Sequence, residues 1–126
     1  MYTVAVQQEL IARHYLIGGD FGAENHPHSH HYRVEARVSG RALDAHGFLV
    51  DIDLLKAALA AAAGRFRDRT LNDLPEFAGL NPSIEHLCRI LCRILAAALP
   101  ARGGALLRVT VWEDPAAWAA YTCTLP

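Results

Sequence analysis

The sequence lacks the features that mark membrane, disulfide-rich and nucleic-acid-binding proteins. Its longest apolar run, residues 57–63, is far too short to cross a bilayer. Its three cysteines contain no Cys-x-x-Cys pair, and free thiols fit a reducing compartment. The formal net charge is -1, without a basic stripe or an acidic tail. We therefore expect a soluble cytoplasmic protein that binds neither membranes nor nucleic acid.

What is present indicates one small globular domain. The chain has 126 residues, of which 52% are hydrophobic, so it can form a core of its own. We expect a single domain over residues 1–126. Domains of this size often complete their cores and sites by oligomerising.

Alternation of polar and apolar residues predicts four strands. They are expected at residues 2–12, 32–38, 107–112 and 118–125. The second is the clearest, because every even residue from Tyr32 to Val38 is apolar or aromatic while the odd residues are charged. Residues 48–50 are a candidate for a short extension of the sheet.

Helical spacing of apolar residues predicts two helices between the second and third strands. They are expected at residues 54–63 and 84–98. Asp51 or Asp53 is the expected N-cap of the first, and Gly64 its expected end. Asn81, followed by a proline, is the expected N-cap of the second. The polar segment between them, residues 65–80, is expected to be a long functional loop.

Histidines are concentrated in the first half of the chain, where His28 and His30 are separated by one residue. On a strand, residues i and i+2 face the same way, so both imidazoles can reach one metal ion. His14 would be brought alongside by an antiparallel first strand. Three histidines with an open fourth position are typical of catalytic zinc. Taken alone, His-x-His is a weak signal, and on spacing alone surface histidines in a polar loop are the favoured interpretation.

Several short motifs, in order along nearly the whole chain, resemble the 6-pyruvoyl-tetrahydropterin synthase and 6-carboxytetrahydropterin synthase family. The stretch from His28 to Tyr32 resembles its His-Gly-His-Asn-Tyr motif. The other matching segments are Ala12-Arg13-His14, His46 to Ile52, Thr70 to Asp73, Asn81 to Leu87, and Val111-Trp112-Glu113 with Tyr121 following.

The resemblance implies an α+β tunnelling fold with a four-stranded antiparallel sheet and two helices on one face, in the order ββααββ. It further implies a barrel shared by three chains, doubled to a homohexamer, with the site near a subunit interface. A reduced pterin is the implied small-molecule substrate and zinc the implied cofactor.

The resemblance also suggests roles for individual residues. His14, His28 and His30 match the zinc ligands, and Glu113 matches the glutamate that anchors the pterin. A carboxylate suits that task because it can accept two parallel N–H bonds from the 2-amino-pyrimidine edge. Two further residues, Glu85 and Ser83, occupy positions of secondary substrate contacts, although first-turn helix residues are an equally simple interpretation for both.

The sequence departs from the family pattern at its proton-transfer residues. The family's cysteine, four residues before the first histidine of the motif, is Glu24 here. The family's Asp-His pair is replaced by Arg67 and Asp68. Glu24 is therefore the candidate acid/base, and Asp68 a second candidate. Some family members with this glutamate cleave dihydroneopterin to 6-hydroxymethyl-dihydropterin.

These observations favour a zinc-dependent lyase acting on the side chain of dihydroneopterin or its triphosphate. One rival is a catalytically degenerate homologue that binds zinc and pterin without turnover. Another is a structural module that uses its histidines for packing.

Overall fold

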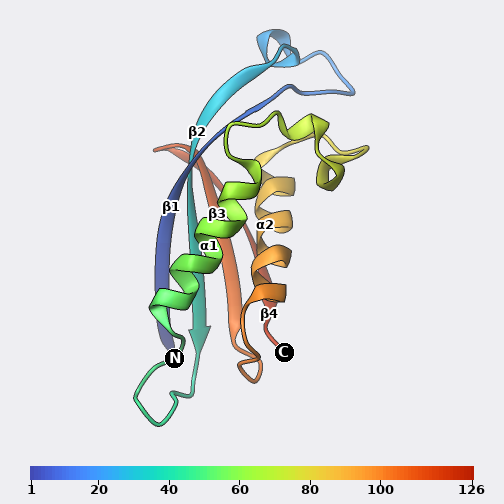
Figure 1. The fold of residues 1–126 in the computed structure, drawn as a ribbon. Helices are drawn as coiled ribbons and strands as arrows, with labels where there is room; N and C mark the ends of the chain where they lie inside the picture. Colours follow the sequence, from blue (N-terminus) through green and yellow to red (C-terminus); the bar gives the residue numbers. More distant parts are fainter.

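The four alternating segments form one antiparallel sheet with the strand order β1-β2-β3-β4, and two α-helices cover one of its faces (Figure 1). The computed structural model describes residues 1–126. Its elements are β1 (Tyr2–His14), η1 (Gly22–Asn25), β2 (His28–Gly40), α1 (Ile52–Phe66), η2 (Leu71–Asp73), η3 (Pro75–Phe77), α2 (Ile84–Ala98), β3 (Leu106–Asp114) and β4 (Ala117–Thr124). The predicted α+β class and ββααββ order are thus confirmed.

Strands β1 and β2 are both longer than their alternating patterns predict. They pair without a break from Tyr2 opposite Gly40 to His14 opposite His28. The extensions are polar, but ladder hydrogen bonds are made by the backbone and do not depend on apolar side chains. As a result, all three candidate metal ligands lie on paired strands rather than in a loop.

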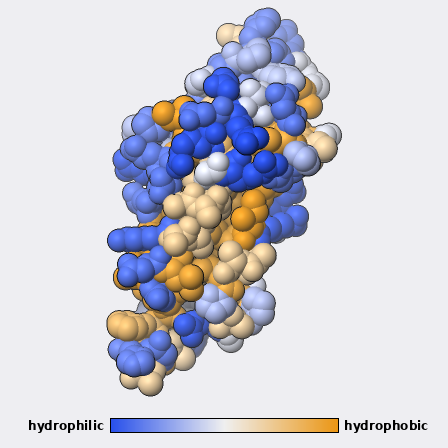
Figure 2. Space-filling view, viewed as in Figure 1, coloured by the Kyte–Doolittle hydropathy of each residue, from blue (hydrophilic) through white to orange (hydrophobic).

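The core lies between the sheet and the helices. Even-numbered residues of β1 and β2 and odd-numbered residues of β3 face it, as the period of a strand requires. Helix α2 lays Leu87, Leu91 and Leu95 against the sheet, each fully buried. Figure 2 shows further apolar residues gathered over the middle of the helix-bearing face.

Both helices begin or end differently from the prediction. Asp51 is the N-cap of α1, and its side chain accepts hydrogen bonds from the N–H groups of Asp53 and Leu54. The helix continues through Gly64, because it places Phe66 in the core against Phe77. This burial outweighs the roughly 1 kcal/mol cost of a helical glycine.

The N-cap of α2 is Ser83, not Asn81. The Ser83 hydroxyl accepts a hydrogen bond from the His86 N–H. The side-chain oxygen of Asn81 is used elsewhere, because it accepts a hydrogen bond from the N–H of Ile17. Asn81 thus ties the loop after β1 to the start of α2.

The predicted sheet extension at residues 48–50 is wrong. The chain turns here, because the Asp44 carboxylate accepts hydrogen bonds from the N–H groups of His46 and Phe48.

On the uncovered face of the sheet, Glu35 is buried although its pattern predicts exposure. It is satisfied by Gln7 and Arg37, which both donate hydrogen bonds to its carboxylate.

Two loops meet at the end of the molecule opposite the chain termini (Figure 1). In the loop after β1, the backbone N–H of Tyr15 donates a hydrogen bond to the side-chain oxygen of Asn72, and the side-chain amide of Asn72 donates one to the Tyr15 carbonyl. Asn72 belongs to the loop that follows α1. An isolated parallel β-bridge between the backbones of Arg13 and Thr70 also joins the end of β1 to that loop. This end of the fold holds the candidate site.

None of the helices combines the length and apolar character needed to span a lipid bilayer.

Candidate metal centre and active site

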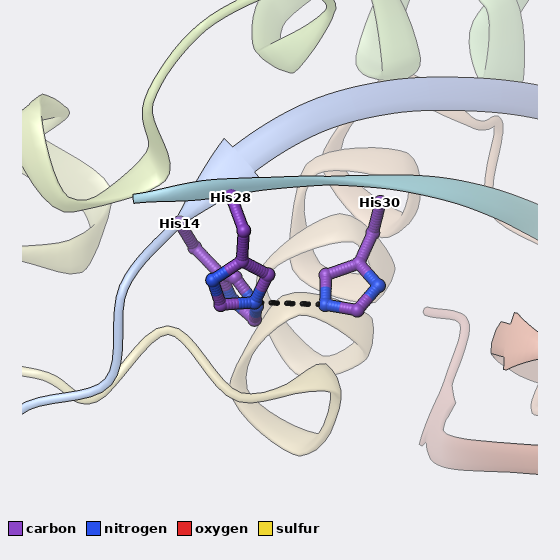
Figure 3. A group of neighbouring side chains, drawn as sticks. All are labelled: His14, His28 and His30. Atoms are coloured by element: carbon purple, nitrogen blue, oxygen red, sulfur yellow. Dashed lines mark hydrogen bonds between the residues drawn. The ribbon is translucent and has the colours of Figure 1, made fainter. Parts of the chain in front are cut away.

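Three imidazoles converge at the end of the β1–β2 hairpin. His14 is the last residue of β1, while His28 and His30 open β2. Because His14 lies opposite His28 in the ladder, and His30 lies two residues further along the same face, all three side chains project to one side (Figure 3).

The distances suit a shared ion. One nitrogen from each ring lies within 4.8 Å of the other two, and His28 Nε2 is 3.0 Å from His30 Nε2. Two nitrogens that are each about 2.0 Å from one tetrahedral zinc are about 3.3 Å apart. The three histidines therefore form a group that can hold a metal ion with small adjustments of the side chains.

The remaining ring nitrogens fix the orientation of two imidazoles. His14 Nδ1 lies 2.7 Å from the carbonyl oxygen of Pro82, and His28 Nδ1 lies 2.7 Å from that of His26. A carbonyl can only accept, so each Nδ1 carries a proton, and in the neutral form of each ring Nε2 presents a lone pair. Such support by a backbone carbonyl is common for metal-ligating histidines.

The environment of His14 is the clearest indication that the three histidines can bind a metal ion. Its ring is buried, and Nε2 has no hydrogen-bond partner in the protein. Burial lowers the pKa of His14, the bond to the Pro82 carbonyl raises it, and the neighbouring His30 and His28 lower it further. A neutral imidazole with a buried, unused lone pair is the state that a zinc ion requires.

Two further side chains lie beside His30. Glu113, near the end of β3, places its Oε1 3.6 Å from His30 Nε2. The ring of Tyr32 lies 5.3 Å from that of His30, and its buried hydroxyl has no hydrogen-bond partner. Burial, followed by the charges of Glu113 and Glu24, raises the pKa of the Tyr32 hydroxyl, which therefore stays a proton donor.

Glu24 lies in η1, within the loop that joins β1 to β2. Its carbonyl accepts a hydrogen bond from the Leu16 N–H, which folds the loop back toward the end of β1. Its carboxylate is exposed. After larger effects, of which burial is the first, the charge of Glu24 raises the pKa values of His14 and Tyr32.

The other predicted site residues form no hydrogen bond or ion pair with the three histidines. Asp68 donates its backbone N–H to the Ile11 carbonyl, three residues before His14, and its carboxylate makes no hydrogen bond or ion pair. Ser83 caps α2 directly after Pro82, whose carbonyl holds His14. Glu85 is an exposed residue of the first turn.

The remaining histidines near the motif are directed elsewhere. His31 faces the opposite side of the sheet, where its Nε2 lies 3.3 Å from a carboxylate oxygen of Glu9. His86 is bound through Nδ1 to the Asn81 carbonyl. Neither belongs to the metal-binding group.

The family of the chain follows from comparison with known proteins. The model of the 6-pyruvoyl tetrahydropterin synthase family matches residues 3–123, almost the full length. The chain belongs to this family. Membership supports a pterin-related lyase function. A search of curated proteins finds no match.

Solved structures of family members share the fold at low sequence identity. The 6-pyruvoyl tetrahydropterin synthase of Caenorhabditis elegans superposes with a TM-score of 0.83 at 20% identity, covering 97% of this chain and 95% of its own. A Plasmodium vivax 6-pyruvoyltetrahydropterin synthase, a catalytic-residue mutant with glutamate changed to alanine, gives 0.81 at 15% identity, with 98% of each chain covered. The fold assignment is therefore independent of the short motifs.

Sequence reasoning missed the supporting groups of the site. The carbonyls of Pro82 and His26 leave no side-chain signal in the sequence, because any residue carries one. Tyr32 could have been noticed, since it follows His30 at the same strand period and ends the matching motif.

Proposed function

We propose that this chain is a zinc-dependent lyase that acts on the side chain of a reduced pterin, 7,8-dihydroneopterin or its triphosphate. The observation that carries the proposal is the unused, buried Nε2 of His14 beside the two facing Nε2 atoms of His28 and His30. Family membership supplies the pterin class. The free cysteines support a reducing, cytoplasmic setting.

His14, His28 and His30 would hold the zinc, which when bound supplies Lewis-acid polarisation of substrate oxygens. Glu113 binds the 2-amino-pyrimidine edge of the pterin through two parallel hydrogen bonds. Glu113 Oε1 lies 3.6 Å from His30 Nε2, so a pterin bound to Glu113 would lie next to the three histidines. Ser83 and Glu85, at the start of α2, are proposed as secondary contacts to the substrate.

Glu24 acts as the base. Its carboxylate takes the proton from the hydroxyl on the second side-chain carbon, and the bond between the first and second carbons breaks. The electron pair passes to the pterin ring, and a proton returned to the first carbon gives 6-hydroxymethyl-dihydropterin. The second and third carbons leave as a two-carbon aldehyde. Asp68 is a second candidate for the proton transfers.

Product analysis tests the reaction. Purified zinc-loaded protein is incubated with dihydroneopterin and, separately, with its triphosphate, and the products are separated by chromatography. We expect 6-hydroxymethyl-dihydropterin from dihydroneopterin. Tight pterin binding without turnover of either substrate would favour the catalytically degenerate homologue, a reading supported by the loss of the family's Cys and Asp-His residues.

We further propose that the chain works as a homo-oligomer, with a hexamer of two stacked trimers as the expected state. Strands β1 and β4 are the two edges of the sheet, and only the end of β1 is covered, by the bridge from Arg13 to Thr70. Uncovered edges favour pairing with another chain. Ile11 and Trp118, on the edge strands, are exposed apolar residues.

Light scattering of the purified protein tests this assembly. At micromolar concentration we expect a mass of about six chains, because three sheets closed into a barrel leave no free edge and the proposed assembly stacks two such trimers. A mass equal to one chain of 13.8 kDa would contradict the proposal.

A further inference from the structure

Two cysteines on different elements meet at the far side of the core from the metal centre. Cys92 lies on α2 and is fully buried, whereas Cys123 lies on the edge strand β4 and is partly exposed. Their Sγ atoms are 3.2 Å apart. A disulfide bond measures about 2.0 Å, so closing the gap requires the sulfurs to approach by only about 1.2 Å.

The third cysteine is directed away from this pair. Cys88, one turn earlier on α2, donates its Sγ–H to the carbonyl of Glu85, 3.1 Å away. Cys92 lies against β3 and β4, where its Sγ is also 3.6 Å from the Leu107 carbonyl, and Leu107 is the ladder partner of Cys123. The packing therefore selects Cys123 as the partner of Cys92.

We propose that Cys92 and Cys123 form a reversible thiol–disulfide pair that joins α2 to β4 when the protein meets hydrogen peroxide. The two thiols differ in their access to solvent, because Cys92 is fully buried and Cys123 is partly exposed. Burial, followed by the hydrogen bond with Cys123, raises the pKa of Cys92 to about 12, so Cys92 stays a thiol. Cys123 is the one of the two that solvent reaches, so it meets the oxidant first.

The chemistry balances with one peroxide per chain. The Cys123 thiolate attacks one peroxide oxygen, the O–O bond breaks, and the products are a sulfenic acid and one water. The Cys92 sulfur then attacks the Cys123 sulfur, the S–O bond breaks, and the hydroxyl leaves as a second water with the Cys92 proton. The two thiols lose two electrons, and the peroxide gains them. A small thiol such as dithiothreitol reverses the step by exchange.

Thiol counting and peptide mapping test the pair in the folded protein. After mild peroxide treatment, we expect the count of free thiols to fall from three to one, with Cys88 remaining. Dithiothreitol should restore all three. Mapping that finds Cys88 in the bond, or a folded wild type whose thiols are oxidised without any disulfide, would overturn the proposal.

Three single variants provide matched controls. Cys88→Ala should still form the disulfide, and Cys123→Ser should form none. Cys92→Ala should accumulate a sulfenic acid at Cys123 that dimedone traps. If Cys92→Ala does not fold, Cys123→Ser keeps the test intact, because residue 123 is partly exposed. A disulfide that persists in Cys123→Ser would also overturn the assignment.

Discussion

Replacing His28 with alanine is expected to reduce the zinc content from about one ion per chain to almost none. The change removes one of three imidazole nitrogens that lie within 4.8 Å of one another. Only two candidate ligands, His14 and His30, then remain. His28 is half-buried at the end of the hairpin, so its truncation leaves the core packing unchanged. Elemental analysis of the purified variant and of zinc-soaked protein measures the effect.

His31→Ala is the matched control for this prediction. It removes an imidazole from the same strand, three residues along, but from the opposite face, where its neighbour is Glu9. Zinc content should stay at the wild-type level. The three-histidine centre would be refuted if wild type, after soaking with zinc, carried no metal, or if the two variants lost zinc equally.

Replacing Glu24 with glutamine should lower the rate of side-chain cleavage by roughly two to four orders of magnitude, the usual contribution of a general base. The amide has nearly the same shape as the carboxylate but cannot accept the proton. Zinc content and pterin affinity should be unchanged, because Glu24 is neither one of the three imidazole ligands nor the proposed pterin anchor. Single-turnover kinetics with dihydroneopterin measures the rate, and fluorescence titration measures binding.

Glu113→Gln provides the contrasting result. It should raise the dissociation constant for the pterin, because the amide offers only one acceptor oxygen to the two N–H groups of the ring.

Full activity in Glu24→Gln would contradict the role of Glu24 as the base and would leave Asp68 or His86 as the candidate. Asp68→Asn and His86→Gln would then be compared in the same assay.

The sequence predicted the sheet well because each strand buries one face. Residues 32–38 alternate strictly, and their even members are fully buried. The strand ends were underestimated, since residues 28–31 are polar and extend into the end of the hairpin, where the backbone ladder alone holds them. Pattern reasoning has no access to hydrogen bonds that every residue type can make.

The errors at the helix ends have a similar cause. Asn81 and Gly64 carry the usual signals of a helix start and a helix stop, but tertiary contacts override both. Asn81 is engaged by the backbone of Ile17, and the helix passes Gly64 to bury Phe66. Local preferences of about 1 kcal/mol yield to such contacts.

The convergence of the three candidate metal ligands was predictable, because their spacing reflects strand geometry and the matching motif extends beyond them. The positions of Glu24 and Asp68 were less predictable, since both are exposed loop residues. Their side-chain positions depend on loop packing, which no periodicity describes. For Asp68, the left-handed backbone, with φ of +59°, also has no sequence signature beyond the tolerance of aspartate for it.

All three imidazoles belong to the two strands of one hairpin, and they lie where those strands separate into the loop. An ion bound there would cross-link the open end of the hairpin, so the free energy of binding would also be free energy of folding. At a free zinc concentration 100 times the dissociation constant, this linkage amounts to about 2.7 kcal/mol. The zinc concentration in the cell would then affect the fraction of chains that are folded. Conversely, a substitution that weakens the packing of β1 on β2 would raise the zinc concentration needed to fill the centre.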